Sequence, residues 1–491
     1  MDPRTEYRLR QAEHNTRRHF LRTCTLGLGG MALGGLLGCE ATGGNVPPPA
    51  GPVEANLATA FRLVPRARRV IYLHMAGAPS QLELFDHKPK LRELHGQDCP
   101  QSLLEGKKFA FIQGVPKMLG AQAEFGRYGQ TGQTVSDLLP HFSRVIDEVA
   151  LLKAVHTEEF NHAPAQLLMQ TGHNQPGRPS LGAWSVYGLG SENENLPGFI
   201  VLGSGGRDPS AGKKLWGSGF LPSIHQGIQC RTAGDPILYL SNPDNMPREL
   251  RGQSIAAINA LNQRRYDELG DPETLTRIRQ YEMAFKMQVS VPEVMDITRE
   301  PAAMHALYGT DPGKTTFANN CLMARRLTEA GVRFVQLYDW GWDTHGTSRN
   351  DNLEDQLRKK CREIDRGMSA LLLDLKQRGL LEDTLVVWGG EFGRTPMQES
   401  RGGIAKPYFG RDHHGEAFTM WMAGGGVRPG TYGATDEIGF AGVAGRMHVH
   451  DVQATILAAL GIDHERLTYP FQGRNFRLTD VHGHVNHDLL I

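Results

Sequence analysis

The stretch TLVVWGGEFGRTP, residues 384–396, predicts the class of fold. Residues 384–388 form a short apolar and β-branched run, which is typical of a strand buried on both faces. An amphipathic helical pattern over 353–378 precedes this run. Two glycines allow a sharp turn after it, and Glu391 and Arg394 follow at once. A buried strand that ends in polar side chains on a glycine-rich loop is expected at the ligand-binding edge of a parallel sheet.

The same alternation of apolar runs and helical patterns continues along the chain. It predicts strands at 70–73, 150–154, 199–202, 332–337 and 418–422, and helices at 315–330 and 451–460. The predicted fold class is therefore α/β, with a mostly parallel sheet covered by helices on both faces. Residues 248–307 are polar and strand-free, and predict a helical insertion into this domain.

The N-terminal region predicts export rather than folded structure. Residues 16–22 read TRRHFLR, a twin-arginine signal, and the apolar run after them is too short to span a bilayer. This run ends in LLGC, in which Cys39 resembles the lipidated cysteine of a bacterial lipoprotein. The alternative is an ordinary twin-arginine signal with an incidental cysteine. We expect a signal over 1–39, a flexible tether over 40–60, a folded domain over 61–491, and a periplasmic or cell-surface protein anchored in the membrane by lipid.

Composition excludes some classes of partner. The 491 residues carry a formal net charge of zero at a pI of about 7.3, which argues against a nucleic-acid partner. The cysteines beyond the signal are widely spaced and match no zinc motif.

Histidines and carboxylates concentrate in loops that follow the predicted strands. The loops contain HMAGAPSQLELFDHKP, VHTEEFNHAPAQLLMQTGHNQPGRPS, YDWGWDTHG, GGEFGRTP and GRDHHGEA. Since these loops meet at one edge of a parallel sheet, we expect a polar functional pocket there. Carboxylate oxygen and imidazole nitrogen are ligands for divalent ions, and the sequence does not distinguish zinc, manganese, calcium and magnesium. The candidate metal ligands are Asp343, His345, Glu391, Asp412, His413 and His414, and which of the last two points inward stays open.

Arg394 is the candidate for binding an anion in that pocket. Its planar guanidinium matches the oxygens of sulfate or phosphate, so we expect it to clamp an oxyanion beside the metal. The alternative is an internal salt bridge between Arg394 and Glu391.

The motifs resemble a bacterial family catalogued as domain of unknown function 1501. The resemblance covers residues from about 60 to the end and rests on AGAPSQLELFD, FNHAPAQLLMQTG, WDTHG, GGEFGRTP, GRDHHGEAFTMWMAGGG and the segment from HVHDVQATIL onward. Members of that family look like sulfatases and alkaline phosphatases in fold. The resemblance therefore implies a sulfatase-like α/β domain.

The resemblance also implies a catalytic place. In sulfatases a Cys-x-Pro-Ser-Arg element begins a helix that ends in Thr-Gly, and its cysteine becomes the nucleophile. Here His162 stands in that place, with Asn161 before it as a contact for substrate oxygen and Thr171-Gly172 after it. Histidine at a helix N-terminus could act as nucleophile, as base or as metal ligand.

Other positions depart from the superfamily. Its second metal-binding Asp-His pair falls on Glu391-Phe392, and its first-strand aspartate is absent, with His74 near its place and Gln81 and Asp86 further on as pocket residues. One metal ion, or none, is therefore expected rather than two.

Together these patterns predict an exported, lipid-anchored, metal-assisted hydrolase of sulfate or phosphate esters. Its substrate would be an anionic small molecule or a sulfated or phosphorylated glycan. The alternative is a non-catalytic, sulfatase-like protein that binds an anionic ligand. A mutase acting on a phosphosugar is a third hypothesis, which the predicted export argues against.

Overall fold

The structure is a computed structural model that describes residues 63–231, 236–237, 242 and 246–491. The contacts of the described residues divide them into two compact units, a larger one within 63–237 and 289–491 and a smaller one within 242–288. The predicted signal and tether over residues 1–60, with Cys39, lie outside the described residues.

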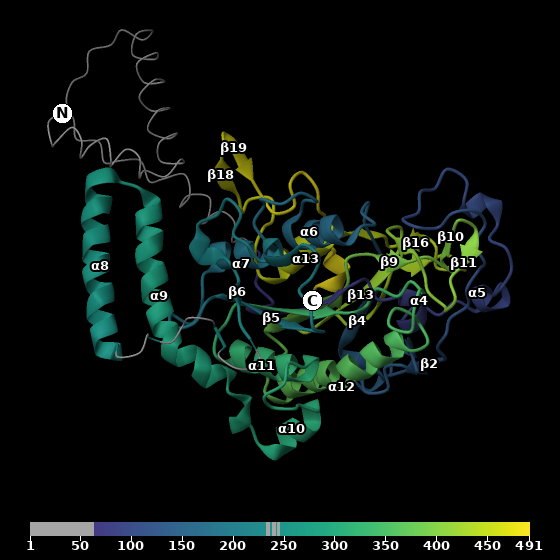
Figure 1. Cartoon of the computed structure of the whole chain (residues 1–491), viewed down its shortest axis with the longest axis horizontal. Helices are drawn as coiled ribbons and strands as arrows, with labels where there is room; N and C mark the ends of the chain where they lie inside the picture. Colours follow the sequence, from purple (N-terminus) through teal and green to yellow (C-terminus); the bar gives the residue numbers. More distant parts are fainter. Residues whose placement is uncertain (1–62, 232–235, 238–241, 243–245) are drawn as a thin grey trace, which may run out of the picture. The chain divides into compact units, whose positions relative to one another are not determined.

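A nine-stranded sheet forms the centre of the larger unit (Figure 1). Eight strands follow the order β14-β4-β13-β8-β1-β7-β5-β6, and β17 also pairs with β4. All pairings are parallel except those of β13 with β4 and β8. The strands are β1 (Arg69–Ala76), β4 (Val149–His156), β5 (Phe199–Ser204), β6 (Ile228–Gln229), β7 (Phe334–Trp340), β8 (Thr384–Gly389), β13 (Phe418–Ala423), β14 (Gly430–Tyr432) and β17 (Met447–His448). The predicted mostly parallel α/β sheet is confirmed.

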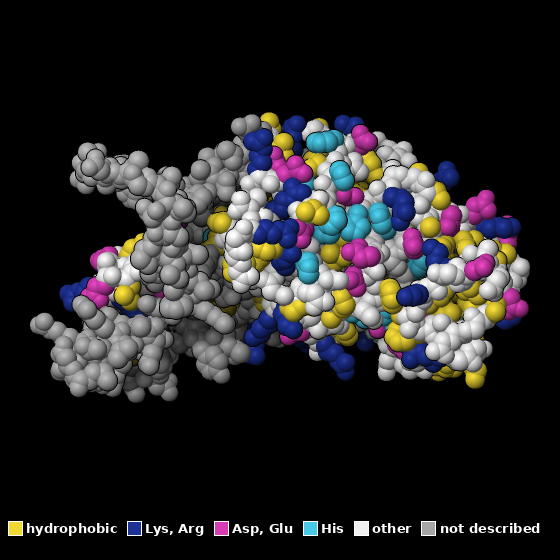
Figure 2. Space-filling view, turned by 90° about the horizontal axis from the view of Figure 1, so that it is seen from above, with side chains coloured by type: hydrophobic (Ala, Val, Ile, Leu, Met, Phe, Trp, Pro, Cys, Tyr) yellow, Lys and Arg dark blue, Asp and Glu magenta, His cyan; other side chains and the backbone are white. Residues whose placement is uncertain are grey.

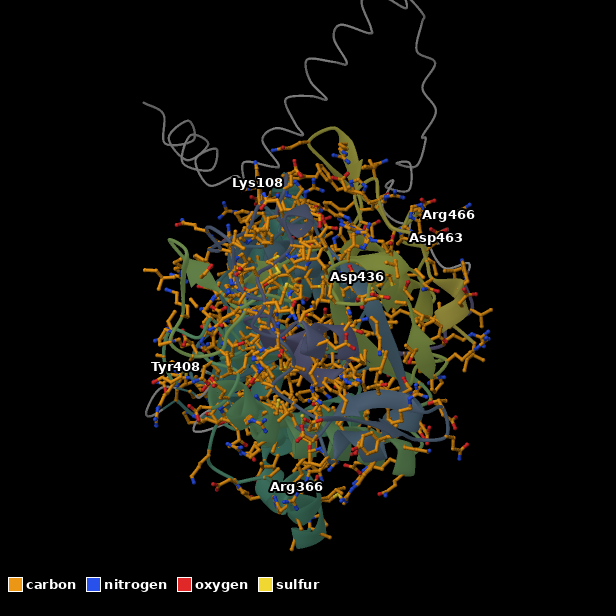
Figure 3. All side chains as sticks on the ribbon, turned by 90° about the vertical axis from the view of Figure 1, so that its right-hand side faces the viewer. Lys108, Arg366, Tyr408, Asp436, Asp463 and Arg466 are labelled. Atoms are coloured by element: carbon orange, nitrogen blue, oxygen red, sulfur yellow. The ribbon has the colours of Figure 1, made fainter. Side chains whose placement is uncertain are left out.

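Helices cover both faces of this sheet (Figure 1). One face carries α6 (His162–Thr171), α7 (Leu181–Leu189) and α13 (Val449–Ala459), and the other carries α10 (Ala302–Tyr308), α11 (Phe317–Glu329) and α12 (Gln356–Gln377). The apolar stripe of α12 is buried as predicted. Arg366 of α12, labelled in Figure 3, joins it to α10 by donating from Nε to the Leu307 carbonyl at 3.2 Å.

Two boundaries differ from the sequence prediction for local reasons. The strand expected from residue 332 begins at Phe334, because the Val332 N–H bonds back to the Leu327 carbonyl and extends the end of α11. The last helix begins at Val449 rather than at 451, because His448 and Asp451 form a reciprocal capping box at its N-terminus.

Short elements form the connections. They are α4 (Gln81–Leu84), α5 (Pro89–Glu93), and the two-stranded pairs β2 (Phe125–Tyr128) with β3 (Gln133–Ser136), β9 (Gly393–Arg394) with β12 (His413–His414), β10 (Ser400–Arg401) with β11 (Ile404–Ala405), β15 (Ala434–Thr435) with β16 (Gly442–Ala444), and β18 (Tyr469–Phe471) with β19 (Arg474–Phe476). The 3-10 turns are η1 (Gln101–Leu103), η2 (Phe142–Arg144), η3 (Ile146–Glu148), η4 (Gly212–Leu215), η5 (Ser223–His225), η6 (Ile297–Arg299) and η7 (His487–Leu489).

The predicted insertion contains two long helices, α8 (Arg248–Leu269) and α9 (Pro272–Met295). The Arg248 guanidinium lies 4.2 Å from the ring centroid of Phe285, so a cation–π contact joins the two helices. Among the described residues, no helix has the length and apolarity needed to cross a membrane. The cysteines of this part, Cys99, Cys230, Cys321 and Cys361, are buried free thiols.

Candidate metal centre

Four loop segments meet at one edge of the sheet because the parallel strands all end there. His74 lies near the end of β1, beside Gly389 of β8 and Tyr338 of β7 in the strand register. The loop after β7 carries Asp343 and the loop after β8 carries Glu391. The helix that follows β4 begins at His162.

Asp343 lies at the centre of a histidine cluster. Its Oδ1 is 3.3 Å from Nε2 of His162, 2.8 Å from Nε2 of His345 and 3.3 Å from Nε2 of His413. One potential ligand atom from each of these four residues lies within 4.8 Å of every other. Three imidazole nitrogens and one carboxylate oxygen therefore converge on a volume the size of a metal site.

Nδ1 of each histidine contacts an oxygen atom on the side of the ring away from the cluster. His162 Nδ1 lies 2.7 Å from Glu391 Oε1, and His345 Nδ1 contacts Glu399 Oε2. His413 Nδ1 lies 2.7 Å from the Phe160 carbonyl oxygen, which can only accept a hydrogen bond. Nδ1 of His413 therefore carries its proton, and its Nε2 directs a lone pair toward the cluster. A carboxylate or carbonyl behind each ligating imidazole is the arrangement that orients histidines on metal ions.

The pKa shifts in this cluster favour positive charge beside Asp343. Burial opposes charge on Asp343, but the nearby Arg394 charge and the three histidine rings beside it hold its pKa well below the ordinary value. Burial likewise opposes charge on His162, yet Asp343 and Glu391 raise its pKa to about 9. Burial lowers the pKa of His413 to about 4, so this ring stays neutral and its lone pair faces the Asp343 carboxylate.

One buried atom supports the same interpretation. His162 Nε2 is buried and makes no hydrogen bond, although it lies 3.3 Å from Asp343. Buried polar atoms in folded proteins nearly always have a partner. A divalent cation held by His162, Asp343, His345 and His413 would give this atom a partner, and the nitrogen-and-oxygen donor set suits such an ion.

The chain's sequence matches one family model over residues 67–490, described as "Protein of unknown function (DUF1501)". This protein is a member of the DUF1501 family. No curated protein matches it.

Solved structures that resemble this DUF1501 protein include a sulfatase and an alkaline phosphatase. The PsFucS1 sulfatase from Pseudoalteromonas sp. is 11% identical at a TM-score of 0.36, with 86% of this chain and 73% of that chain covered. The alkaline phosphatase from the Antarctic bacterium TAB5 is 9% identical at a TM-score of 0.33, with coverages of 82% and 99%. At such scores the interpretation of the site rests on the DUF1501 chain's own side chains.

Glu391 is bound behind His162 and does not join the four convergent ligands. It is fully buried, and its Oε1 accepts from the Gly77 N–H at 3.0 Å and from Gln166 Nε2 at 2.9 Å, besides its contact with His162. His74 Nε2 lies 3.4 Å from its other oxygen. In the structure Glu391, predicted as a candidate metal ligand, therefore lies behind His162 and outside the four-residue cluster.

Arg394 does not clamp an external oxyanion. Its side chain is fully buried, and its guanidinium donates to the carbonyls of Ala78, Gly77 and Arg411 and to Asp343 Oδ1, at 2.6 Å for the last. Gln81 also bonds both backbone groups of Arg394 at 2.9 Å. All three guanidinium nitrogens donate to groups inside the protein, so Arg394 positions Asp343 instead.

His414 points away from the centre. In β12 it is adjacent to His413, and neighbouring residues of a strand face opposite sides. Its Nε2 contacts the Phe440 carbonyl at 2.5 Å, in a loop that Asp436 (labelled in Figure 3) organises by accepting the N–H groups of Ile438, Phe440 and Ala441. His413 is therefore the inward histidine, and the prediction of His414 as a ligand is wrong.

Asp412 and Asp86 also have structural partners. Asp412 accepts the N–H groups of Phe111 and Ile112, both at 2.8 Å, and so fixes the loop over the cluster. Asp412 also lies close to His345 and Glu399, in a second group that could hold a metal ion. Its Oδ2, however, already accepts hydrogen bonds from two backbone N–H groups. The contacts of Asp86 are with Thr435 and Lys88, outside the histidine cluster.

Four features of the site escaped the sequence analysis. Glu399 is fully buried behind His345, the Phe160 carbonyl lies behind His413, and Gln166 bonds Glu391. The fourth feature is Gly77. Its φ is +112°, and a Cβ at this position would lie only 2.6 Å from the Asp343 backbone nitrogen, so no other residue fits there. Of these, the glycine after the first strand was the one visible signal in the sequence.

The centre is open to solvent on one side. Asp343 and His162 are 31% and 15% exposed as side chains, whereas His413 is 3% exposed. Figure 2 shows histidine side chains gathered on one face, with acidic and basic side chains around them. Asn161 precedes α6 as an exposed residue whose side chain makes no capping hydrogen bond.

Proposed function

We propose that this DUF1501 protein is a metal-assisted hydrolase of sulfate or phosphate esters carried on an anionic small molecule or glycan. The observation that supports it most is the convergence of three histidine Nε2 atoms on Asp343, each ring held from behind by an acceptor. A bound divalent ion would supply a Lewis acid for the ester oxygen and lower the pKa of water.

The N-terminus of α6 lies beside this cluster and suits an incoming anion. The ten-residue helix begins at His162, whose side chain belongs to the cluster, and the first N–H groups of a helix have no intrahelical partner. Backbone N–H groups in this position stabilise negative charge that develops on a reacting ester. The exposed side chain of Asn161 is available for a substrate oxygen.

The contacts of His162 favour one of its three open roles. Its Nδ1 is engaged by Glu391 and its Nε2 faces Asp343, so neither nitrogen is free to attack an ester. We therefore assign His162 as a ligand and water as the nucleophile. The orienting contacts leave His162, His345 and His413 aimed at the same point.

A second candidate function is a binding protein without turnover. Two observations favour it: histidine stands where sulfatases have their nucleophile, and Arg394 is buried away from substrate. An anion-binding pocket would remain in such a protein, whereas hydrolysis would not.

Hydrolysis of small aryl esters distinguishes the two functions. Full-length protein purified from its native export route is expected to contain one divalent ion per chain by elemental analysis. It is then expected to release nitrophenol from an aryl sulfate or an aryl phosphate, with separate reactions identifying the ester, and to lose this activity with a chelator. A metal-loaded protein that hydrolyses neither aryl esters nor sulfated or phosphorylated sugars, yet binds inorganic sulfate or phosphate, would support the binding protein.

We also propose that the protein is exported and anchored through Cys39. The twin-arginine motif over 16–22 and the LLGC sequence that ends at Cys39 support this. Cys39→Ser is expected to move the protein from the membrane fraction to the soluble periplasmic or secreted fraction, because the lipidated residue is lost. Unchanged membrane association of this variant would reject the lipid anchor.

A further inference from the structure

A polar cavity of about 790 Å³ adjoins the metal centre. It is lined by the end of β7 from Asp339 to Gly341, by the start of α11, and by the first turns of α12. Asp343 also lines it, and Asp343 is the most exposed of the four convergent side chains. A substrate whose ester lies at the metal centre would therefore extend into this cavity.

The cavity carries excess positive charge. On its buried side, Lys360 pairs with Asp339 at 2.7 Å and with Glu363 at 2.9 Å. Asp343 is compensated by Arg394 at 2.6 Å. The exposed Arg207 and Arg362 have no acidic partner within 4.0 Å among the described residues, so their charges are not neutralised by the protein.

The rest of the lining suits a sugar better than an acyl chain or a peptide. Beside the charged side chains it includes the hydroxyls of Ser204, Thr315 and Thr316, the amides of Asn350 and Gln356, and the partly exposed indole of Trp340. Such groups bind sugar hydroxyls, and an indole offers an apolar face for a sugar ring. The apolar lining side chains beyond Trp340 are Phe317 and Ala318, both buried.

We propose that this cavity is a subsite for a second anionic group on an acidic oligosaccharide, bound by Arg207 and Arg362 while the ester of another sugar lies at the metal centre. Only the placement of the ester at the metal centre rests on the proposed function. Anion binding in the cavity itself depends only on Arg207, Arg362 and the polar lining. Substrates with a single charged group would leave the two arginines unused.

Binding of a heparin hexasaccharide to the full-length, metal-loaded protein tests the subsite. Arg207→Glu with Arg362→Glu is expected to weaken this binding at least about tenfold, since two attractive ion pairs become repulsive. The measurement is titration calorimetry at two salt concentrations, with a smaller salt dependence expected for the variant. A neutral hexasaccharide, with neither sulfate nor carboxylate groups, is expected to bind both proteins equally.

A second double charge reversal provides the matched control. Arg144 precedes β4 and Arg428 follows the antiparallel β13, so both lie at the opposite edge of the sheet. Both are exposed, and Arg144→Glu with Arg428→Glu changes the net charge by the same amount. This control is expected to bind the hexasaccharide like the unaltered protein, and all proteins to keep their metal.

Three results would overturn the subsite: no binding by the unaltered protein, equal weakening in both double variants, or no weakening in either. Failure of the proposed function is a separate result, because it appears as absent aryl-ester hydrolysis by the unaltered, metal-loaded protein. In that case the comparison of hexasaccharide binding between the two double variants still tests anion binding in the cavity.

Discussion

Asp343→Ala protein is expected to bind no divalent ion at a concentration that saturates the unaltered protein. Asp343 supplies the one oxygen among the convergent ligands, and its Oδ1 contacts Nε2 of all three histidines. Without it, three imidazoles face one another with no anionic ligand to offset the charge of the ion. The loss should exceed the roughly 10–100-fold that follows removal of a partner behind a ligand.

Elemental analysis after dialysis, together with titration of the apoprotein with zinc and manganese, measures this effect. Glu399→Gln is a graded control, because it keeps all four ligands and changes only the acceptor behind His345; its expected loss of affinity is about 10–100-fold. His162→Ala is expected to lose the ion as well. Full metal content in Asp343→Ala, with the fold intact by circular dichroism, would show that the ion binds elsewhere or not at all.

Glu83→Ala is expected to destabilise the whole protein by about 3–5 kcal/mol, because it leaves a buried arginine without its anion. Glu83 and Arg411 are both fully buried, and Arg411 NH2 donates to Glu83 Oε1 at 2.6 Å. Arg411 also donates to the carbonyls of Thr395 and Gly120 at 3.2 Å each. These bonds connect α4 to the segment that carries His413, so the variant should also lower the affinity for metal.

Chemical denaturation followed by circular dichroism measures the stability change. Glu83→Met combined with Arg411→Met removes both charges together, and replacement of a buried pair by apolar residues of similar volume is often close to neutral. This double variant is therefore expected to be more stable than Glu83→Ala alone. A single variant as stable as the unaltered protein would contradict the interpretation of the pair as a tightly coupled buried contact.

The strands and the inward residues of the loops were accessible from sequence because their signals are local. Apolar runs such as 384–388 predict strands, and polar residues directly after them lie at one sheet edge. This argument placed Asp343, His345 and His162 near one another without coordinates.

The direction of individual side chains was not accessible in the same way. Choosing between His413 and His414 requires the register of β12 against β9, and one residue of slippage exchanges their faces. The buried position of the Arg394 side chain depends on hydrogen bonds to the carbonyls of Gly77 and Ala78, which lie more than 300 residues away in sequence. Backbone acceptors carry no residue-type signal, so sequence patterns overstated how open this arginine is.

The acceptors that orient the three histidines come from distant parts of the chain. The contacts of His162 with Glu391 and of His413 with Phe160 span 229 and 253 residues. If the cluster binds an ion as proposed, a partly synthesised or partly folded polypeptide would lack the oriented histidines, and occupancy would report that folding is complete. If the twin-arginine route carries this protein in folded form, the metal pool that loads it is the cytoplasmic one.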